Sequence, residues 1–356
     1  MSTLATNAIT DASGGNTTTI NGYTPTVSNM AGRNRLINSD MRIDQRNAGA
    51  SYTNSNQALY GLDRWKSFGV TDAVLTIQQN TNAPSGFSNS QSVTVTTSTT
   101  ANDGGGLSQS IEGNNVFDLA WGTSSGVAVT ASFWVRASVI GTYNIYLRYF
   151  GSTATYYYVA TYTVNVANTW EQKTINIEAP PVGAGAFTAA LNTAYLEFRP
   201  VFSSSGNTTT VAANTWSTSN ASKTAGCVDF VSNSGATFYI TGVQLEEGSV
   251  ATPFEHRMYG QELALCQRYY EEFNAPGSDL FLYPIYTGDT AGYRRLAIFY
   301  KVNKRAVPTV TPTWYGNPGA SRGVNGVTTD MCDIYVNGAG ASEYASLSKL
   351  TMSAEV

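Results

Sequence analysis

The sequence GVAVTASFWVRAS, residues 126–138, carries the clearest signal of the fold class of this chain. Apolar side chains recur in it at every second position, at Val127, Val129, Ala131, Phe133 and Val135. Because successive side chains of a β-strand point to opposite faces, these five share one face. The stretch therefore predicts a strand that buries one face in a core.

Runs of the same kind lie on both sides of this stretch, separated by Gly and Asn. They include SVTVTTSTT, GTYNIYLRYF, TATYYYVATYTVNV, WEQKTINI, TAYLEFRP and ATFYITGVQLEEG. In GTYNIYLRYF, one face holds Ile145, Leu147 and Tyr149, and the other holds Tyr146 and Arg148. Short strands at this spacing predict an all-β fold, with a jelly-roll β-sandwich over residues 35–256. The lack of a fixed repeat argues against a solenoid.

The composition is that of a β protein whose polarity comes from hydroxyl and amide groups. Only 12% of the 356 residues are charged, against roughly a quarter in ordinary globular proteins. The net charge is −4 and no basic run exceeds YRR or NKR, which argues against nucleic-acid binding. The N-terminus lacks a secretory signal, and no run of about eighteen apolar residues is present, so we expect no membrane insertion.

The three cysteines, Cys227, Cys266 and Cys332, are odd in number and far apart in sequence. They fit neither a disulfide framework nor a CxxC metal site, so synthesis in a reducing cytoplasm is the simplest account. Residues 1–34 are polar, and their run ITDASGGNTTTING predicts a β-hairpin. A lone hairpin is marginal in water, so we expect this segment to pair with other chains or to dock on a larger body.

One helix is predicted, as a linking segment over residues 257–273 that contains MYGQELALCQRYYEEF. Leu265, Tyr269 and Phe273 recur at four-residue spacing, and a second apolar stripe adjoins them. Such a broad apolar face indicates a position between domains or between subunits, and the three residues are candidates for an oligomer interface. Packing on its own domain is the alternative.

Residues 274–356 form a second β region, which we expect to be a small distal β-sandwich. Its strand candidates include DLFLYPIYTG, CDIYVNG and SLSKLTMSAEV. Pro308 and Pro312 are expected at strand ends or on an edge strand, because proline cannot donate a ladder hydrogen bond. The closing strand suits a compact terminal tip.

Several segments resemble tail proteins of tailed bacteriophages and prophages, and they occur in the same order. These are GRNRLINSDMRIDQRNAGAS, YGLDRW, SFWVRAS, NTWEQKTINI, TFYITGVQLEEGSVATPFEHRMYGQELALCQRYY, KRAVPTVTP and SLSKLTMSAEV. The middle region also resembles the galactose-binding-like jelly roll of carbohydrate-binding modules. The likeness extends from about residue 6 onward, and LDRW together with VQLEEGSVATPFE is its most specific part.

This resemblance implies a homotrimeric tail fibre or tail-tip subunit that binds a glycan or other receptor on the host surface. It further implies a virion protein, assembled in the host cytoplasm, whose residues 1–34 attach it to other tail or baseplate proteins. A purely structural virion protein, such as a capsid decoration or connector fibre, is the second hypothesis. A polysaccharide depolymerase is the third.

Under this resemblance, INSDMRIDQRNAG at residues 37–49 becomes the first strand of the jelly roll. Met41 and Ile43 are then expected to point inward. The outward residues Asp40, Arg42, Asp44 and Arg46 alternate in charge, as in a solvated face or an ion-pair ladder between subunits.

Catalysis has little support in the sequence, and we expect no enzyme. The single histidine, His256, would have to serve any Ser-His-Asp triad, and a structural role beside the helix start suits it better. Adjacent Glu246 and Glu247 would face opposite sides of a strand, so they cannot form a glycosidase pair. A structural calcium ion is common in jelly rolls of this type, but no EF-hand-like Asp spacing assigns it ligands.

Sugar binding by aromatic side chains has more support, because sugar rings present apolar faces that stack on Trp and Tyr. The candidates lie where aromatics meet turn residues in the distal region: Tyr286, Tyr293, Trp314 and Tyr315. Packing is the alternative for each. Trp65, Trp134 and Trp170 lie in framework-like motifs and are expected to fill the core.

Overall fold

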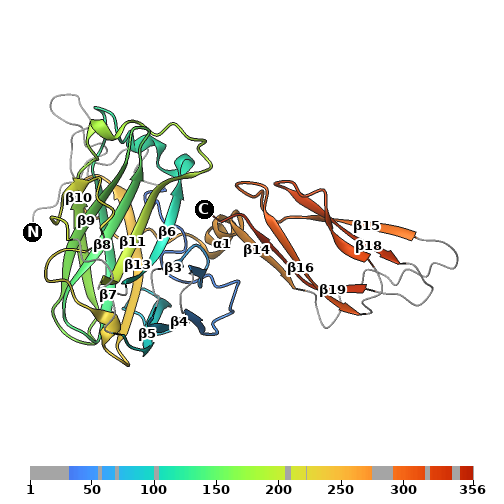
Figure 1. Ribbon diagram of the computed structural model, residues 1–356, viewed down its shortest axis with the longest axis horizontal. Coiled ribbons are helices and arrows are strands. Elements are labelled where there is room, and N and C mark those ends of the chain that lie inside the picture. Colours follow the sequence, from blue (N-terminus) through green and yellow to red (C-terminus); the bar gives the residue numbers. More distant parts are fainter. Residues whose placement is uncertain are drawn as a thin grey trace, which may run out of the picture.

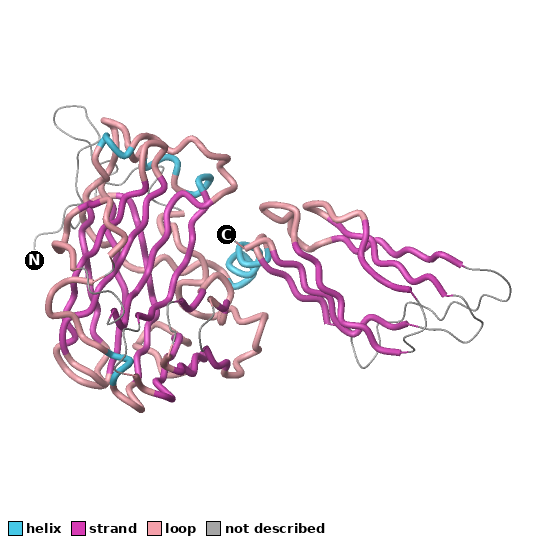
Figure 2. The backbone as a smooth tube through the Cα atoms, viewed as in Figure 1, coloured by secondary structure: helices cyan, strands magenta, loops and turns pink. Residues whose placement is uncertain are grey.

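The computed structural model describes residues 32–54, 58–68, 72–99, 104–204, 210–221, 223–274, 292–316, 321–338 and 345–355. These residues form a large β-sandwich and a smaller distal β domain, with one α-helix between them (Figures 1 and 2). The predicted all-β fold with a jelly-roll-like sandwich is confirmed. Among the described helices, none is long and apolar enough to cross a membrane. The predicted N-terminal hairpin lies outside the described residues.

The large domain consists of two antiparallel sheets packed face to face. The six-stranded sheet has the order β1 (Tyr52–Asn54), β4 (Val74–Asn80), β5 (Ser90–Thr97), β13 (Thr237–Glu247), β7 (Val129–Ala137) and β10 (Glu171–Ile177). The seven-stranded sheet has the order β12 (Trp216–Ser217), β9 (Thr155–Val164), β8 (Gly141–Phe150), β11 (Ala194–Ser204), β6 (Gly104–Glu112), β3 (Lys66–Phe68) and β2 (Leu59–Tyr60). Short 3-10 helices lie in the loops, at Gly113–Asn115, Phe117–Leu119, Val182–Ala184 and Phe230–Ser232.

The core of this sandwich lies between the two sheets and follows the alternation read from the sequence. On β7, Val129, Phe133 and Val135 are fully buried, and on β8 the same holds for Ile145 and Leu147. Each of these side chains comes from the predicted inner face. Burying one large apolar side chain stabilises a fold by about 1.5 to 3 kcal/mol, so this double row is a major source of stability.

The distal domain contains two three-stranded antiparallel sheets. One has the order β14 (Tyr270–Asn274), β19 (Ala345–Ser353) and β16 (Thr309–Gly316), and the other β15 (Gly292–Phe299), β18 (Met331–Gly338) and β17 (Ser321–Asn325). Pro312 lies in β16, at the edge of its sheet, and Pro308 precedes that strand, as predicted. The described core of this domain is small, with buried Leu347, Leu350 and Met352 at its centre.

The helix is shorter than predicted. Helix α1 covers Tyr259–Gln267, and the run from Tyr270 to Asn274 is strand β14, paired with β19. Pairing with a strand about eighty residues away overrides the local helical periodicity, as tertiary contacts commonly do. Helix α1 lies between the two domains, which is one of the two expected positions.

Residues 37–49 form turns rather than the predicted first strand. Met41 and Ile43 are buried as expected, but Asn38 and Met41 have positive φ values of 53° and 59°. The side chain of Asn38 supplies hydrogen-bond partners for backbone groups that a neighbouring strand would otherwise pair with. Its oxygen accepts from the backbone N–H of Ile43 at 2.9 Å, and its Nδ2 donates to the carbonyl oxygen of Asp63 at 2.9 Å. A strand partner is therefore unnecessary here.

The charges of this segment have partners within the chain, so the expected placement of all four on one outer face, as a solvated face or as an ion-pair ladder between subunits, is wrong. Asp40 pairs with Arg42 and is itself buried. Asp44 accepts hydrogen bonds from backbone N–H groups of the following turn, including that of Gly49 at 2.7 Å. Arg46 pairs with Glu355 at 2.6 Å. Turn geometry directs each side chain separately, which a two-residue period cannot describe.

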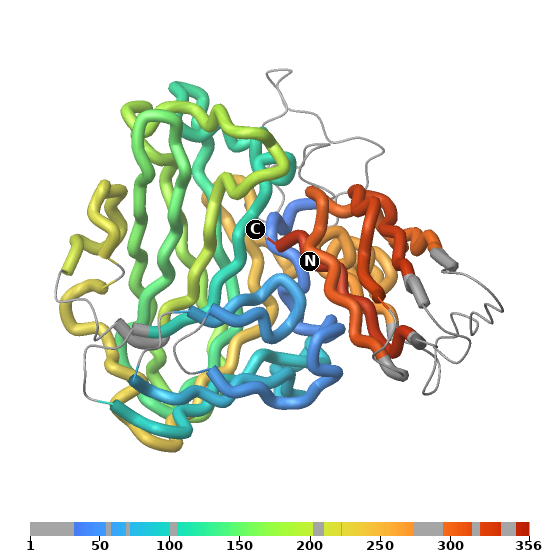
Figure 3. The backbone as a smooth tube through the Cα atoms, turned by 45° about the vertical axis from the view of Figure 1, so that its right-hand side comes forward, coloured from blue at the N-terminus to red at the C-terminus, as the bar shows by residue number. Residues whose placement is uncertain are grey.

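The end of the chain lies beside the large domain, where the two domains meet (Figure 3). A cluster of ion pairs forms there around Glu355. The carboxylate of Glu355 pairs with both Arg46 and Arg64, and the side chain of Arg64 is only 1% exposed. The Arg64 guanidinium carbon lies 3.5 Å from the ring centroid of Tyr269, and that of Arg46 lies 3.6 Å from the ring centroid of Tyr270. The closing strand thus returns to the junction instead of forming the terminal tip expected from the sequence.

The LDRW motif lies at this junction and divides its residues between two environments. Leu62 and Trp65 enter the core of the large domain, whereas Arg64 points to the distal domain. Asp63 is buried, and its carboxylate accepts from the backbone N–H of Gln45 at 2.6 Å and from its Nε2 at 2.8 Å. A positive φ of 70° at Arg64 accompanies this arrangement.

Asp63 should make the stability of the protein pH-dependent. Burial raises the pKa of its carboxyl from the ordinary 3.8 to about 6, although hydrogen bonds from Gln45 and the charge of Arg46 lower it. The folded state therefore binds the proton more tightly, and the stability that Asp63 contributes falls as pH rises from about 4 to about 6. As the pH rises from about 4 to about 6, the free energy of unfolding of Asp63→Asn should increase relative to that of the wild type by on the order of 2 kcal/mol. Urea unfolding of both proteins at several pH values measures this, and a constant difference would contradict it.

Candidate functional site

The predicted sugar-binding residues are only partly visible in the structure. Tyr286 lies outside the described residues, and Tyr293 in β15 and Tyr315 in β16 are described only by their backbone. Trp314 in β16 is half-buried and packs against the distal core, with the guanidinium carbon of Arg322 5.7 Å from its ring centroid. Their role in binding stays a prediction, and Trp314 has a packing role.

The three interface candidates make contacts within this chain. Tyr269 is fully buried and packs with Cys266, and Leu265 lies at the edge of the same cluster. Phe273 packs against the core of the distal domain. These contacts account for the broad apolar face of the predicted helix, because different residues of this segment pack against the two domains. A role between subunits stays a prediction.

The residues considered for catalysis lie apart from one another. His256 is exposed, and its ring packs against Phe254 at 4.9 Å between centroids. Glu246 is buried while Glu247 is exposed, so the two carboxylates face opposite sides, as predicted. Among the described residues, no three His, Cys, Asp or Glu side chains gather as a metal site would require.

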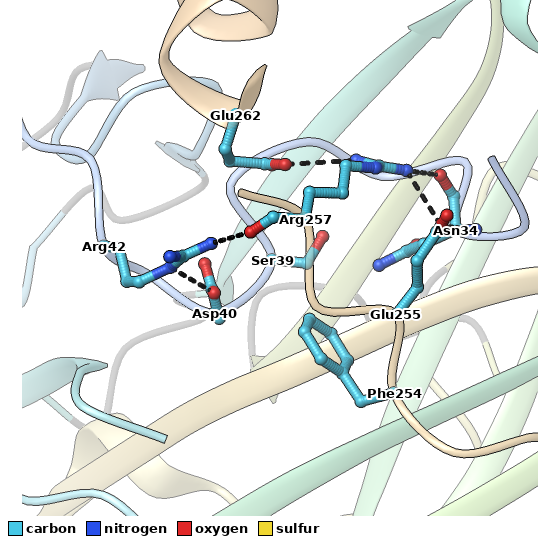
Figure 4. Close-up of a pocket in the computed structure, with 8 residues that line it drawn as sticks. All are labelled: Asn34, Ser39, Asp40, Arg42, Phe254, Glu255, Arg257 and Glu262. Atoms are coloured by element: carbon cyan, nitrogen blue, oxygen red, sulfur yellow. Dashed lines mark hydrogen bonds and ion pairs between the residues drawn. The ribbon is translucent and has the colours of Figure 1, made fainter. Parts of the chain in front are cut away.

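One small pocket lies beside the start of α1 (Figure 4). The residues that line it are Asn34, Ser39, Asp40, Arg42, Phe254, Glu255, Arg257 and Glu262. It measures about 170 Å³ including open solvent, and it has no enclosed space for even a water molecule. The pocket is therefore too small for a sugar.

Arg257 occupies this pocket and binds to residues on several of its sides. Its guanidinium donates to Glu262 Oε2 at 3.3 Å and to the carbonyl oxygen of Asn34, and it pairs with Glu255 at 3.3 Å. Glu255 also accepts from the backbone N–H of Asn34 at 2.8 Å. These bonds join the segment that enters the large domain to the segment that leads to α1. The pocket thus has a structural role.

The motif VQLEEGSVATPFE has a structural role in the same place. The buried carboxylate of Glu246 accepts from the backbone N–H of Thr252 at 2.8 Å, from its hydroxyl at 2.6 Å and from Gln244 Nε2 at 2.8 Å. Gln244 Oε1 accepts from the backbone N–H of Glu255 at 2.8 Å. The motif therefore returns the chain from β13 toward α1, and Gln244, Glu246 and Glu255 form their hydrogen bonds within the fold.

The strongest candidate for a ligand-binding surface is the outer face of the seven-stranded sheet. Because Ile145 and Leu147 of β8 point into the core, the residues between them point outward. The register then sets Arg148 of β8 opposite Tyr157 of β9 and opposite Glu197 of β11. We use the term outer face for Lys66, Phe68, Arg148, Phe150, Tyr157, Glu197 and Arg199. Tyr146 lies on the same side of the sheet but is buried with Val159 and Val201.

Glu197 lies between two arginines on the outer face. Its Oε2 is 2.7 Å from Arg199 Nη2 and 3.9 Å from Arg148 Nη1. The Glu197 side chain is only 5% exposed, whereas that of Arg148 is 33% exposed. Glu197 therefore holds Arg199 by a close ion pair, while Arg148 keeps much of its contact with solvent.

Aromatic rings flank both guanidinium groups. The guanidinium carbon of Arg148 lies 4.4 Å from the ring centroid of Phe150 and 5.8 Å from that of Tyr157. The guanidinium carbon of Arg199 lies 4.6 Å from the ring centroid of Phe68. Cation–π attraction holds such side chains in place while the half-buried rings keep part of their surface exposed. Aromatic surface beside fixed polar groups is the chemistry by which proteins bind sugars.

The opposite outer surface, on the six-stranded sheet, also carries aromatic residues. Trp134 and Trp170 are half-buried there, so the expectation that they fill the core is wrong; only Trp65 of the three is fully buried. The reason is the alternation in β7, which turns Trp134 away from the core. Tyr239 lies beside Trp170, and the Arg136 guanidinium carbon is 5.0 Å from the Tyr239 ring centroid. This surface offers a matched control for the outer face.

No protein-family model matches this sequence, and no curated protein does. Solved structures that resemble part of it include the enzymatically active domain of bacteriophage CBA120 tailspike protein 4, at 14% identity and a TM-score of 0.32, over 60% of this chain and 21% of that chain. The CBM22-1 xylan-binding domain of Paenibacillus barcinonensis Xyn10C matches at 12% identity and a TM-score of 0.30, over 57% of this chain and 98% of its own. The family 11 carbohydrate-binding module of Clostridium thermocellum Lic26A-Cel5E has 13% identity and a TM-score of 0.30, over 57% and 99%. Likenesses this low carry no argument about what the chain binds.

Proposed function

We propose that this protein is a non-enzymatic, glycan-binding subunit of a bacteriophage tail fibre or tail tip, and that its outer face binds a glycan of the host surface. The observation that carries the binding part is the outer face itself. Half-buried aromatic rings there lie beside arginines in fixed positions, and the register of β9, β8 and β11 places Tyr157, Arg148 and Glu197 in one row.

The virion part of the proposal rests on the sequence resemblance, above all on LDRW and VQLEEGSVATPFE. Three further parts of the proposal rest on the same resemblance: the homotrimer, the location in the phage tail, and the attachment to tail or baseplate proteins through residues 1–34. A structural virion protein is the alternative, and it would have no use for an accessible row of rings and cations. Release of reducing ends from a host polysaccharide would favour the depolymerase instead.

Tyr157→Ala should weaken binding to host polysaccharide. Loss of one stacking ring should reduce the free energy of binding by about 1 to 2 kcal/mol, which lowers the affinity roughly five- to thirtyfold. The measurement is binding of the purified protein to polysaccharide from a susceptible host, by isothermal titration calorimetry. Tyr239→Ala is the control, because it removes a half-buried tyrosine with a neighbouring arginine from the opposite surface.

The two variants also distinguish other locations of the site. Loss of binding in Tyr239→Ala but not in Tyr157→Ala would move the site to the six-stranded sheet. Unchanged binding in both would direct attention to the distal residues Trp314 and Tyr315. Absence of binding by the unaltered protein to every host polysaccharide tested would contradict the proposed function.

A further inference from the structure

Resting on the proposed function, we infer that the ligand of the outer face is an acidic glycan, one that carries several carboxylate or phosphate groups. Among the described residues of this face, three are cations, Lys66, Arg148 and Arg199, and one is a carboxylate, Glu197. The chain as a whole has a net charge of −4, so the positive face is a local feature. A polyanion is the occupant that this charge complements.

Arg148 is the centre of this inference, because its guanidinium has no hydrogen-bond partner among the described residues. Its contact with Glu197 is 3.9 Å, beyond hydrogen-bond range, and its Nε is unpaired but buried, so the terminal nitrogens are the groups that a ligand can reach. By comparison, Arg199 donates to Glu197 at 2.7 Å, and Arg136 on the opposite surface donates to the carbonyl oxygen of Asn168 at 2.8 Å. The terminal nitrogens of this partly exposed guanidinium carry four N–H donors, which fit the two oxygens of a carboxylate or phosphate.

The surroundings of Arg148 prepare it for this role. Phe150 lies against the guanidinium and Tyr157 lies beside it, so the charge is held at the face instead of extending into solvent. A sugar ring stacked on Tyr157 would bring its acid group next to Arg148. The same contact thus combines the apolar surface of the ring with the charge of its substituent.

Lys66 extends the cationic surface across the sheet. Within the described part of the chain its ammonium group makes no ion pair, and its nearest recorded partner is the ring of Tyr60, with 5.7 Å from Nζ to the centroid. Strands β8 and β3 are separated by β11 and β6, so the backbones that carry Arg148 and Lys66 lie about 14 Å apart. One monosaccharide cannot span this distance. The geometry therefore fits an oligosaccharide that runs across the strands and carries more than one acid group.

The test compares acidic and neutral forms of the same polymers. Uronate-containing bacterial polysaccharides would be immobilised in native form and after carboxyl reduction, which turns each acid group into an alcohol. We expect at least tenfold tighter binding to the native forms, and we expect Arg148→Gln to remove most of this preference. Glu197 keeps its pair with Arg199 in this variant, so the fold should be retained. Arg136→Gln, which alters the opposite surface, should leave the preference unchanged.

Equal binding to native and reduced polymers would overturn the inference while leaving the proposed function intact, provided that binding still depends on Tyr157. A preference that survives in Arg148→Gln would also overturn it. Heparin serves as a polyanion of unrelated structure. If heparin binds as tightly as the uronate polymers and Tyr157→Ala does not weaken that binding, the face attracts charge alone and recognises no acidic glycan.

Discussion

Glu355→Gln is expected to loosen the junction between the two domains and to lower the free energy of unfolding by about 3 to 5 kcal/mol, the usual effect of removing one partner of a buried ion pair. The substitution leaves Arg64, whose side chain is 1% exposed, without its carboxylate. Arg46, 15% exposed, loses the same partner. Urea unfolding measures the loss, and small-angle X-ray scattering should show a larger radius of gyration.

Asp118→Asn is the matched control for this prediction. It removes the carboxylate from the Arg35–Asp118 pair, in which the Asp118 side chain is 49% exposed. Exposed pairs contribute about 1 kcal/mol or less, because water and salt screen them. If both variants lose the same small amount, the cluster around Glu355 does not hold the domains together.

Trp65→Ala should also lower the free energy of unfolding by about 3 to 5 kcal/mol, because it opens a cavity in the core of the large domain. The Trp65 side chain is fully buried, and its Nε1 donates to the carbonyl oxygen of Asn38 at 2.9 Å. The substitution therefore also removes a buried hydrogen bond that fixes the turn at residues 37–49. Thermal unfolding monitored by circular dichroism would report a large fall in the melting temperature.

Trp170→Ala serves as the comparison, since it removes the same side chain from a half-exposed position. Its Nε1 donates to Asn82 Oδ1 at 3.2 Å, a contact that water can replace. We expect a loss of about 1 kcal/mol or less. Similar losses in the two variants would mean that Trp65 does not have the core role that its burial indicates.

The strands and their inner faces were predictable from the sequence. In β7 and β8, the residues expected inside, such as Phe133 and Leu147, are the buried ones. The helix end at Gln267 was not predictable, because Tyr270 leaves the helical pattern only through its pairing with Ser353 of β19. The turns at residues 37–49 depend in the same way on hydrogen bonds of Asn38 that reach across the fold.

The candidate ligand-binding face was missed, although part of its signal was present. The two-residue period of GTYNIYLRYF puts Tyr146 and Arg148 on the face opposite Ile145 and Leu147, and TAYLEFRP shows the same spacing for Glu197 and Arg199. Their importance lies in the register between β8 and β11, which sets Glu197 opposite Arg148. Register depends on the pairing of separate strands, so a single sequence does not reveal it.

Which segments are strands, and which side of each strand is buried, can be read from the sequence, because a two-residue period is a local property of the chain. Which charged groups find partners depends on the folded arrangement of the whole chain. Arg64 and Arg148 both lie in a strand-rich part of the sequence, and their sequence surroundings do not distinguish them. Arg64 meets Glu355, 291 positions away, and is buried with it. Arg148 lies 3.9 Å from a carboxylate that Arg199 already holds, and its side chain stays partly exposed. Ion pairing depends on distances between remote parts of the chain, and the folded chain alone sets those distances.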